Sequence, residues 1–489
     1  MLAKNLRVEL NEEQLRAVTH TGTPLLVLAG AGSGKTRVLT YRAAWMIDKE
    51  KVEANRIVLL TFTNKAAGEM RERISKLTDK QVGFAGTFHT FCAKLLRQYG
   101  RRIGVEPGFV IYDSGDSESA MKEAIGNIGL DPKRCRPRGL MSVISRMKNE
   151  LQTVEEIEPS VASVWREYRR LMKKYEALDF DDLLVRAVEL LREKEIGEKV
   201  RELYGYILVD EYQDTNKAQF ELTKLLVSRG ERLSVVGDAS QAIYSFRGAD
   251  FRNLSLLKQD FPELTEVRLE VNYRSTQNIL DGAYGVINNN TNHPILRLTT
   301  NEGTGEKISL YEAGDEKDEA IYVVNRLAEE PETESAILYR TNAQSRAFEE
   351  ELLRRGIGYK LVGGTRFYER AEIKDLIAYL RVIANEKDGV SWKRIEKMGK
   401  RKKIKFEEWL GKNKKLMVKM KAGEVLEEVL QVTDYKAGFD EKDEMDRGRL
   451  ENIDEFRAVA GEHEGLEAFL ESVSLIQADE EAEQKKKEK

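Results

Sequence analysis

Short apolar runs that end in small or polar residues recur along the first half of the chain. Such runs are typical of buried parallel strands, and they predict strands at residues 25–28, 57–60, 206–209 and 233–236. A further strand is predicted where apolar residues alternate at Val267, Leu269 and Val271. Between these runs the apolar positions follow helical spacing, as at Val38 and Met46. Alternating strands and helices indicate an α/β fold with a parallel sheet.

Two segments interrupt this alternation. From about residue 113 to residue 174 the sequence is Arg-rich and helix-like, which predicts a helical insertion in the first α/β unit. Strand-like runs at 308–311, 336–339 and 359–362 predict a second α/β unit, and from about residue 385 the pattern is helical again. The predicted organisation is a first lobe (1–105 and 180–273), its helical insertion (106–179), a second lobe (274–384), a helical subdomain (385–475) and a charged, solvated tail (476–489).

Composition narrows the class of protein. The 489 residues are 41% hydrophobic with 8 prolines, as in a helix-rich globular protein, and the net charge of −4 gives no basic field over the whole chain. Affinity for nucleic acid would therefore come from local grooves. Two cysteines, Cys92 and Cys135, are too few for a disulfide framework or a four-ligand zinc site. Without a signal-like start or a run of about 18 apolar residues, the sequence predicts a soluble cytoplasmic protein with no membrane partner.

A glycine-rich segment directly after the first predicted strand has the form of a phosphate-binding loop. It reads Ala29, Gly30, Ala31, Gly32, Ser33, Gly34, Lys35, Thr36. A helical pattern follows, which completes the context that the motif requires. Backbone N–H groups and the helix N-terminus favour phosphate, Lys35 reaches the terminal phosphates, and the Thr36 hydroxyl can ligate magnesium. Ala29 replaces the glycine of the strict pattern, a mild change because the Gly-Lys-Thr end carries the phosphate contacts. A chance glycine-rich turn is the alternative.

A pair of acids ends the predicted strand at 206–209. Asp210 is expected to orient the magnesium ion, and the adjacent Glu211 to polarise the attacking water as general base, which favours ATP hydrolysis over binding alone. A plain helix cap is the alternative, weakened by the presence of the loop.

Longer segments resemble the superfamily 1 DNA helicases of the UvrD/PcrA/Rep type. They are residues 61–67 (TFTNKAA), 86–89 (GTFH), 178–183 (LDFDDL), 210–214 (DEYQD), 236–249 (VGDASQAIYSFRGA), 272–275 (NYRS) and 339–346 (YRTNAQSR). The resemblance covers nearly the whole chain. It implies a P-loop RecA-like lobe and a second RecA-like lobe with ATP between them, each lobe with a helical subdomain, and movement along single-stranded DNA in the 3′ to 5′ direction.

The resemblance also implies roles for residues around the nucleotide. Gln14 is expected to read adenine, Arg37 to bind the nucleotide, and Tyr273 to stack on the base. Gln241 is expected to sense the γ-phosphate and Arg274 to act as an arginine finger, a contact typically worth ~10³ to 10⁵ in rate. A buried aromatic and a surface salt bridge are the alternatives for Tyr273 and Arg274.

Single-stranded DNA binding requires aromatic platforms and phosphate contacts. The expected platforms are Phe62, Tyr244 and Phe246, and the expected backbone contacts are Thr63, Asn64, Thr87, His89 and Arg247. Each aromatic has a core position as its alternative, and Phe246 offers a smaller ring than the Trp common in the family. No metal ligands are spaced around His89. The basic run 400–405 is assigned equally to duplex binding at a single-strand/double-strand junction and to a solvated helix face.

The sequence departs from the family pattern after residue 471. Segments resembling T-V-H-x-A-K-G-L-E and Y-V-A-x-T-R-A are not present, so the second lobe is expected to be incomplete. We expect this chain to bind ATP and single-stranded DNA but to hydrolyse ATP slowly. The expected explanations are a fragment, a truncated product, or half of a split helicase whose partner chain completes the lobe. The leading function is a DNA helicase or translocase in repair or replication; a nucleotide-gated DNA-binding subunit is the alternative. A recombination nuclease and an unrelated P-loop kinase or GTPase are disfavoured.

Overall fold

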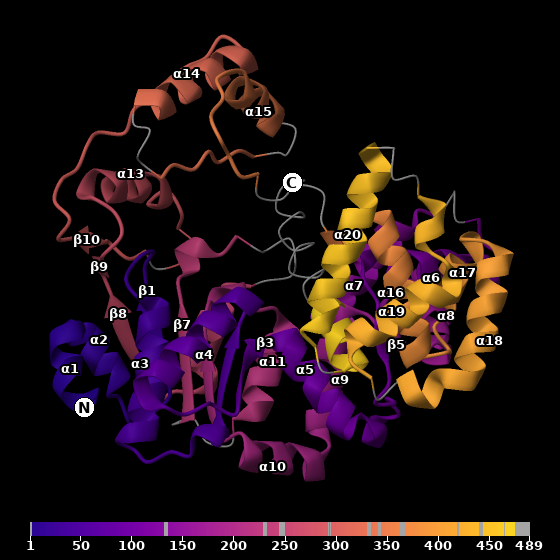
Figure 1. The fold of residues 1–489 in the computed structure, drawn as a ribbon. Helices are drawn as coiled ribbons and strands as arrows, with labels where there is room; N and C mark the ends of the chain where they lie inside the picture. Colours follow the sequence, from indigo (N-terminus) through magenta and orange to yellow (C-terminus); the bar gives the residue numbers. More distant parts are fainter. Residues whose placement is uncertain are drawn as a thin grey trace.

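The fold is an α/β sheet with attached helical regions, as a computed structural model of the chain shows (Figure 1). The structure describes residues 2–131, 135–227, 232–243, 250–291, 293, 295–329, 334–340, 344–361, 367–417, 420–439, 444–463 and 465–474. Six parallel strands form the central sheet in the order β3-β2-β6-β7-β1-β8. They are β1 (Leu25–Ala29), β2 (Ile57–Thr61), β3 (Phe84–Thr87), β6 (Tyr206–Val209), β7 (Leu233–Gly237) and β8 (Thr265–Leu269). The predicted parallel α/β sheet is therefore confirmed.

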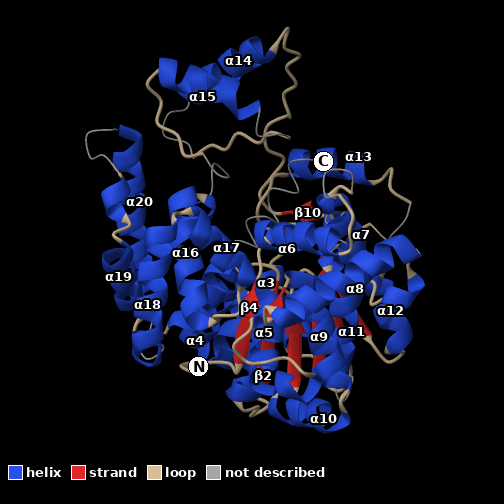
Figure 2. Cartoon of the chain, turned by 90° about the vertical axis from the view of Figure 1, so that its right-hand side faces the viewer, coloured by secondary structure: helices blue, strands red, loops and turns tan. Residues whose placement is uncertain are grey.

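Alternate residues of these strands face two hydrophobic cores, because successive side chains of a strand point to opposite faces. Leu26 and Val58 belong to one core, and their neighbours Leu25 and Ile57 to the other. Figure 2 shows the strands enclosed by helices. The core containing Leu25 is closed by α1 (Leu2–Glu9), α2 (Glu12–Val18), α3 (Lys35–Asp48) and α4 (Asn64–Thr78). The other is closed by α5 (Phe88–Tyr99), α9 (Phe180–Arg192), α10 (Lys194–Leu203), α11 (Lys217–Leu226) and α12 (Asn253–Asp260).

Two helical regions lie side by side at one end of the sheet (Figure 1). The first comprises α6 (Ser114–Asn127), α7 (Pro137–Asn149) and α8 (Pro159–Lys174), with the short strands β4 (Val110–Ile111) and β5 (Ala177–Leu178). The second comprises α16 (Ala371–Ala384), α17 (Gly389–Lys397), α18 (Lys400–Met417), α19 (Ala422–Thr433) and α20 (Glu444–Gly461). Val390 of α17 packs into the core of the first region, and the buried Tyr112 hydroxyl donates to Asp388 Oδ1 at 2.7 Å. The two regions therefore share an interface.

The second α/β unit differs from the prediction. The described residues of the runs 308–311, 336–339 and 359–362 form no strand, and Val362 lies outside the described residues. Parallel strands are stabilised by neighbours on both edges and by burial of both faces. The described residues of these runs have no strand pairing, and Leu310 is 97% and Leu338 92% exposed, so neither condition is met. The helices of this part are α13 (Gln277–Ile287), α14 (Glu316–Glu329) and α15 (Ser345–Arg354), and its strands are β9 (Val271–Asn272) and β10 (Thr299–Thr300).

Two further details correct the sequence interpretation. The single strand predicted from Val267 to Val271 is divided, because β8 ends at Leu269 and Val271 pairs instead with Thr299 in a separate two-stranded sheet. Strand β3 was not predicted, since its sequence Phe-Ala-Gly-Thr contains residues with low strand propensity. No described helix combines the length and the apolar character needed to cross a membrane.

Candidate nucleotide and nucleic-acid site

The glycine-rich loop joins β1 to α3. Gly32 and Gly34 have φ values of +67° and +88°, in the left-handed region that favours glycine. Gly34 is the N-cap of α3 and has no side chain to bond the first turn. A Cβ at Gly34 would also lie 2.8 Å from Gln14 Nε2. The first-turn N–H groups of α3 are therefore left to a ligand, and a helix N-terminus favours an anion.

Gln14 holds this loop from α2. Its Nε2 donates to the Ser33 carbonyl at 2.9 Å, and its Oε1 accepts from the Asn11 backbone N–H at 3.2 Å in a capping box. Asn11 Nδ2 in turn donates to the Tyr273 hydroxyl at 2.8 Å. The Gln14 amide expected to read adenine thus has a partner at both ends, and Tyr273 lies within reach of the same helix.

Five residues, Lys35 among them, form a closed ring of hydrogen bonds. Lys35 Nζ donates to Glu211 Oε2 at 2.7 Å and to Gln241 Oε1 at 3.0 Å. Gln241 Nε2 donates to Asp238 Oδ2 at 2.6 Å. Gln213 closes the ring, because its Nε2 donates to Glu211 Oε2 at 2.8 Å and its Oε1 accepts from the Asp238 backbone N–H at 2.9 Å. The ring joins residues that follow β1, β6 and β7.

Asp210 and Thr36 lie beside this ring. The Thr36 hydroxyl is 3.4 Å from Asp210 Oδ2, and Glu211 has a left-handed φ of +50° that turns the chain at the end of β6. Burial, assisted by the charge of Glu211, raises the pKa of Asp210 to about 6. Hydroxyl and carboxylate oxygens are ligands that suit a divalent cation. A bound cation would also favour the ionised form of Asp210, which burial disfavours.

The last residue of β9 and the two residues after it pack against the glycine-rich loop. Buried Asn272 donates from Nδ2 to the Ala31 carbonyl at 2.6 Å, and the Tyr273 N–H donates to the Gly32 carbonyl at 3.0 Å. Arg274 follows directly: a Cβ at Gly32 would lie 2.8 Å from Arg274 Cβ, and the Arg274 side chain is exposed. Asn272 therefore fixes the position of both Tyr273 and Arg274.

Arg37, on the first turn of α3, points to the N-terminal helix. Its guanidinium is 3.7 Å from Glu9 Oε2 and 5.5 Å from the Tyr41 ring centroid. The side chain predicted to bind the nucleotide is therefore paired within the protein.

The expected DNA contacts gather at the neighbouring strands β2 and β3. These strands are paired in parallel with Thr61 opposite Thr87, so their carboxyl ends share one edge of the sheet. Phe62 is half-buried with its ring centroid 6.1 Å from that of Phe88, and the His89 ring lies edge-on to Phe180 at 5.8 Å.

Thr63 and Thr87 also have structural tasks at this edge. Their hydroxyls accept from the backbone N–H groups of Ala66 and Thr90, respectively, and so cap α4 and α5. Thr87 is buried, whereas Asn64 is half-exposed in the first turn of α4. Tyr244, Phe246 and Arg247 lie outside the described residues, as do Thr341, Asn342 and Ala343.

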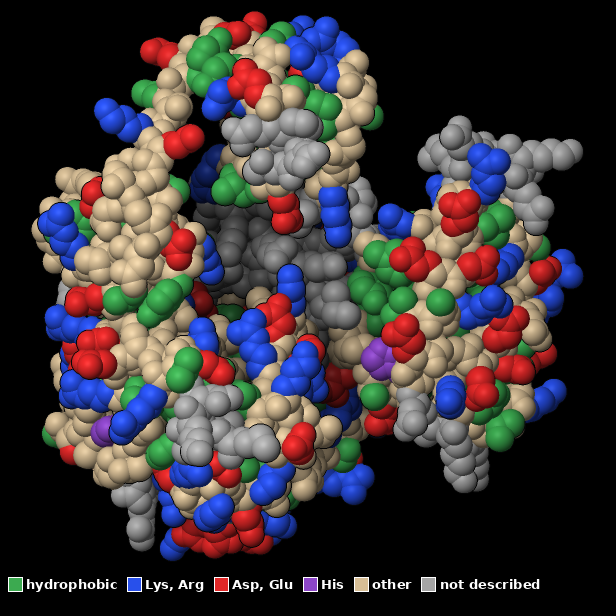
Figure 3. Space-filling model, turned by 60° about the vertical axis from the view of Figure 1, so that its left-hand side comes forward, with side chains coloured by type: hydrophobic (Ala, Val, Ile, Leu, Met, Phe, Trp, Pro, Cys, Tyr) green, Lys and Arg blue, Asp and Glu red, His purple; other side chains and the backbone are tan. Residues whose placement is uncertain are grey.

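Charge is mixed on the face shown in Figure 3, where basic and acidic side chains lie interspersed. In the basic run 400–405, Lys402 lies 5.0 Å from the Tyr435 ring centroid and Lys403 is 3.5 Å from Glu396 Oε1. Two lysines of this run therefore contact the protein itself.

Sequence reasoning missed three polar side chains that build the site. Asn272, Gln213 and Asp238 are all buried, and all were read only as parts of motifs. A buried polar side chain requires partners, but the partner of Asn272 is 241 residues away. The sequence feature that could have pointed to such residues is a polar residue at the end of an apolar strand.

A parallel sheet with a glycine-rich loop after β1, and acids at the end of nearby β6, defines a P-loop nucleotide-binding protein. Residues 10–262 match the UvrD/REP helicase N-terminal domain and residues 267–422 match the UvrD-like helicase C-terminal domain. The chain therefore belongs to the UvrD/REP helicase family, as the resemblance predicted.

Two curated relatives illustrate the similarity. The ATP-dependent DNA helicase PcrA of Staphylococcus epidermidis is 41% identical over 97% of this chain and 73% of its own length. The protein of the same name from Staphylococcus aureus is 40% identical over 96% of this chain and 73% of its own length. The chain is thus homologous to ATP-dependent DNA helicases and spans about three quarters of their length.

Proposed function

We propose that the chain binds ATP with magnesium and couples its hydrolysis to 3′ to 5′ movement along single-stranded DNA, in repair or replication. The observation that supports this best is the hydrogen-bonded ring that includes Lys35, because it connects the phosphate loop to Glu211, which follows β6, and to Gln241. Such a connection is suited to sensing a terminal phosphate. The PcrA relatives are ATP-dependent DNA helicases, which supports the same ligands.

The hydrogen bonds around Lys35 support the proposed phosphate and metal contacts. A terminal phosphate would take the place of Glu211 on Lys35, which frees Glu211 to polarise a water molecule as general base. Gln241, already bonded to Lys35, would register the γ-phosphate. Thr36 and Asp210 would hold the magnesium ion, which when bound offsets charge on the phosphate oxygens.

The remaining nucleotide contacts require rearrangement. Tyr273 is 47% exposed beside the loop and offers a ring for the base. To read adenine, the Gln14 amide would break its hydrogen bond to the Ser33 carbonyl and form one with the base instead. Exposed Arg274 would turn toward the phosphates as the arginine finger.

DNA would cross the edge formed by the ends of β2 and β3. Phe62 would stack on a base, while Thr63, Asn64 and His89 contact the strand. Stacking contributes ~1 to 3 kcal/mol per base and tolerates any sequence. Thr87 would contribute by capping α5 and so holding the DNA-binding residues in place. Tyr244, Phe246 and Arg247 are the other proposed DNA contacts.

We expect slow hydrolysis by this chain alone. The runs 308–311 and 336–339 are unpaired, and Leu310 and Leu338 are almost fully exposed. The same observation favours a second candidate function: an ATP-gated DNA-binding subunit, or half of a split helicase completed by another chain. Strands supplied by another chain could pair with these exposed apolar runs and bury their apolar surface.

The two candidates are separated by ATP binding, DNA binding and single-turnover hydrolysis measured on the same protein. We expect binding of ATP and of oligothymidylate, hydrolysis well below that of a complete PcrA, and loss of ATP binding in Lys35→Ala. Absence of ATP binding would overturn the proposal. Hydrolysis that DNA does not stimulate would favour the DNA-binding subunit, and turnover equal to that of PcrA would contradict the expected slow rate.

A further inference from the structure

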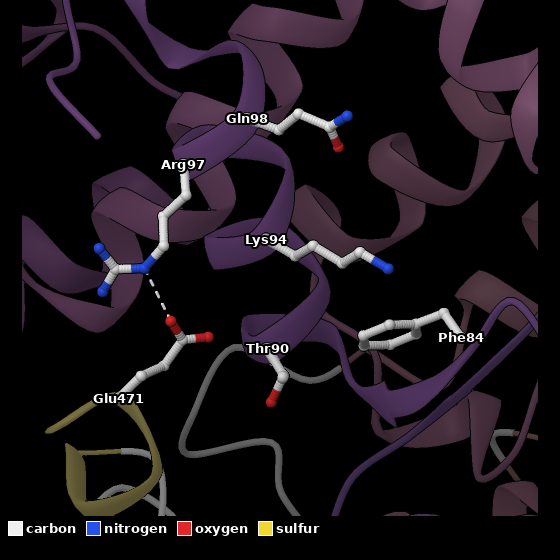
Figure 4. Close-up of a pocket in the computed structure, with 6 residues that line it drawn as sticks. All are labelled: Phe84, Thr90, Lys94, Arg97, Gln98 and Glu471. Carbon is white, nitrogen blue, oxygen red and sulfur yellow. Dashed lines mark hydrogen bonds and ion pairs between the residues drawn. The ribbon is translucent and has the colours of Figure 1, made fainter. Parts of the chain in front are cut away.

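A pocket of about 440 Å³, drawn in Figure 4, lies beside the edge strand β3, which β2, β6 and β7 separate from the β1 strand that leads into the nucleotide loop. It is lined by Phe84, Thr90, Lys94, Arg97, Gln98 and Glu471. Four of these residues project from α5, Phe84 begins β3, and Glu471 belongs to the helical stretch 466–474. The pocket thus lies where the outer strand β3 and helix α5 meet the helical stretch 466–474.

The pocket lining includes two cations, Lys94 and Arg97, and only Arg97 has a carboxylate partner among the described residues. Arg97 is already bonded within the protein, because Nε is 2.7 Å from Glu471 Oε2 and Nη1 donates to the Pro107 carbonyl at 2.7 Å. Lys94 forms no ion pair with the described residues. Its ammonium lies instead 5.4 Å from the ring centroids of both Phe84 and Tyr204. An anion entering the pocket would therefore meet the Lys94 charge.

An aromatic ring stands beside this charge. Phe84 is half-buried and its ring centroid lies 4.9 Å from that of Phe91, which supports it from within the core. The ring folds over Gly86, where a Cβ would lie 2.6 Å from Phe84 Cζ. Figure 4 shows the Phe84 ring next to the end of Lys94, while Arg97 reaches the other way toward Glu471.

The polar residues of α5 connect this pocket to the edge where DNA is proposed to cross. Thr90, Lys94 and Gln98 follow at intervals of four residues and so share one face of the helix. The Thr90 hydroxyl is 2.9 Å from that of Thr87, at the end of β3. Gln98 is exposed, and its amide has no hydrogen-bond partner among the described residues. The face therefore runs from the strand ends down to the pocket.

We propose that this pocket binds one nucleotide unit of a single-stranded DNA that extends past the β2–β3 edge, with Lys94 on a phosphate and Phe84 against a base. The inference rests on the proposed DNA function. A cation, a supported ring, a hydroxyl and a free amide match the phosphate, base and sugar of a flexible strand. The Arg97–Glu471 pair forms the far wall and contributes no net charge.

The test compares oligothymidylates of roughly 4 and roughly 16 nucleotides, lengths that bracket common single-strand site sizes. The variants are Lys94→Gln and Phe84→Leu, and binding is measured by fluorescence anisotropy over a series of salt concentrations. We expect each variant to bind the long strand about fivefold to tenfold more weakly and to bind the short strand like the unmodified chain. Lys94→Gln should also reduce the salt slope by about 1.

Lys199→Gln is the matched control, because its ammonium also lies over an aromatic ring, 5.2 Å from the Tyr99 centroid, but outside the pocket. Equal binding of the long strand by all variants, or equal weakening for both lengths, would overturn this inference alone. If the unmodified chain binds neither oligonucleotide, the proposed function fails together with it. Competition by inorganic phosphate that Lys94→Gln abolishes, without a length effect, would assign the pocket to a free anion and overturn the DNA proposal.

Discussion

Gln213 shows how a single side chain organises the nucleotide site. It is buried, and it contacts both the Glu211 carboxylate and the Asp238 backbone N–H. Gln213→Ala would leave that buried N–H unpaired, a cost of ~1 to 3 kcal/mol, and would release Glu211. We predict a single-turnover rate of ATP hydrolysis reduced about 10- to 100-fold, with ATP affinity changed less than about threefold because Lys35 and the loop remain.

Gln219→Ala supplies the control for this prediction. Gln219 is also buried, but its Oε1 accepts from the Asn216 backbone N–H at the start of α11, away from the ring. Its loss should lower stability and leave the hydrolysis rate per bound ATP unchanged. If both variants lose rate equally, Gln213 acts on folding and does not position Glu211.

The secondary-structure elements show which features were readable from the sequence. β1, β2, β6 and β7 were predicted because a strand buried on both faces is a continuous apolar run. Lys35 and Asp210 could be placed near each other for the same reason, since both follow such strands. The bonds of Asn272 and Gln213 could not be predicted, because they depend on tertiary register between elements far apart in the chain.

The unpaired runs of the second unit give a prediction at this scale. Leu338 is 92% exposed, so Leu338→Ser should change the free energy of unfolding by less than about 0.5 kcal/mol. Leu208 in β6 is fully buried, and Leu208→Ala should cost ~2 to 5 kcal/mol. Urea unfolding followed by circular dichroism measures both. A loss above about 2 kcal/mol for Leu338→Ser would show that this run is a buried strand after all.

For the molecule as a whole, the interface between the two helical regions is polar and buried. Arg381 of α16 bonds Asp116 of α6, Lys374 Nζ is 3.3 Å from Asp113 Oδ2, and Asn385 Nδ2 donates to the Tyr175 carbonyl at 2.8 Å. Buried ion pairs tolerate loss of one partner poorly. These contacts join segments more than 200 residues apart, so no local pattern in the sequence announced them.

Asp116 should make this interface sensitive to pH. Burial, assisted by the nearby Asp113 and Asp388 carboxylates and opposed by Arg381, raises the pKa of Asp116 to about 7. A carboxyl group with a raised pKa in the folded state holds its proton more tightly than in the unfolded chain, where the pKa is about 3.9. Its stabilising contribution is therefore complete at low pH and is lost as the pH rises through about 7. Between pH 8 and pH 6 the free energy of unfolding should rise by about 1.4 kcal/mol from this group.

The test is Asp116→Asn, which keeps an oxygen acceptor for Arg381 and cannot ionise. The free energy of unfolding is measured by guanidinium titration followed by tryptophan fluorescence at pH 6, 7 and 8. Between pH 6 and pH 8 it should change by about 1.4 kcal/mol less in Asp116→Asn than in the unmodified chain. Glu118→Gln, on the same helix, is the control: ion pairs with Lys122 and Arg138 lower the pKa of Glu118, so it stays ionised over this range. The same pH dependence in the unmodified chain and in Asp116→Asn would mean that Asp116 is already ionised at pH 6, so that its pair with Arg381 would outweigh the effect of burial.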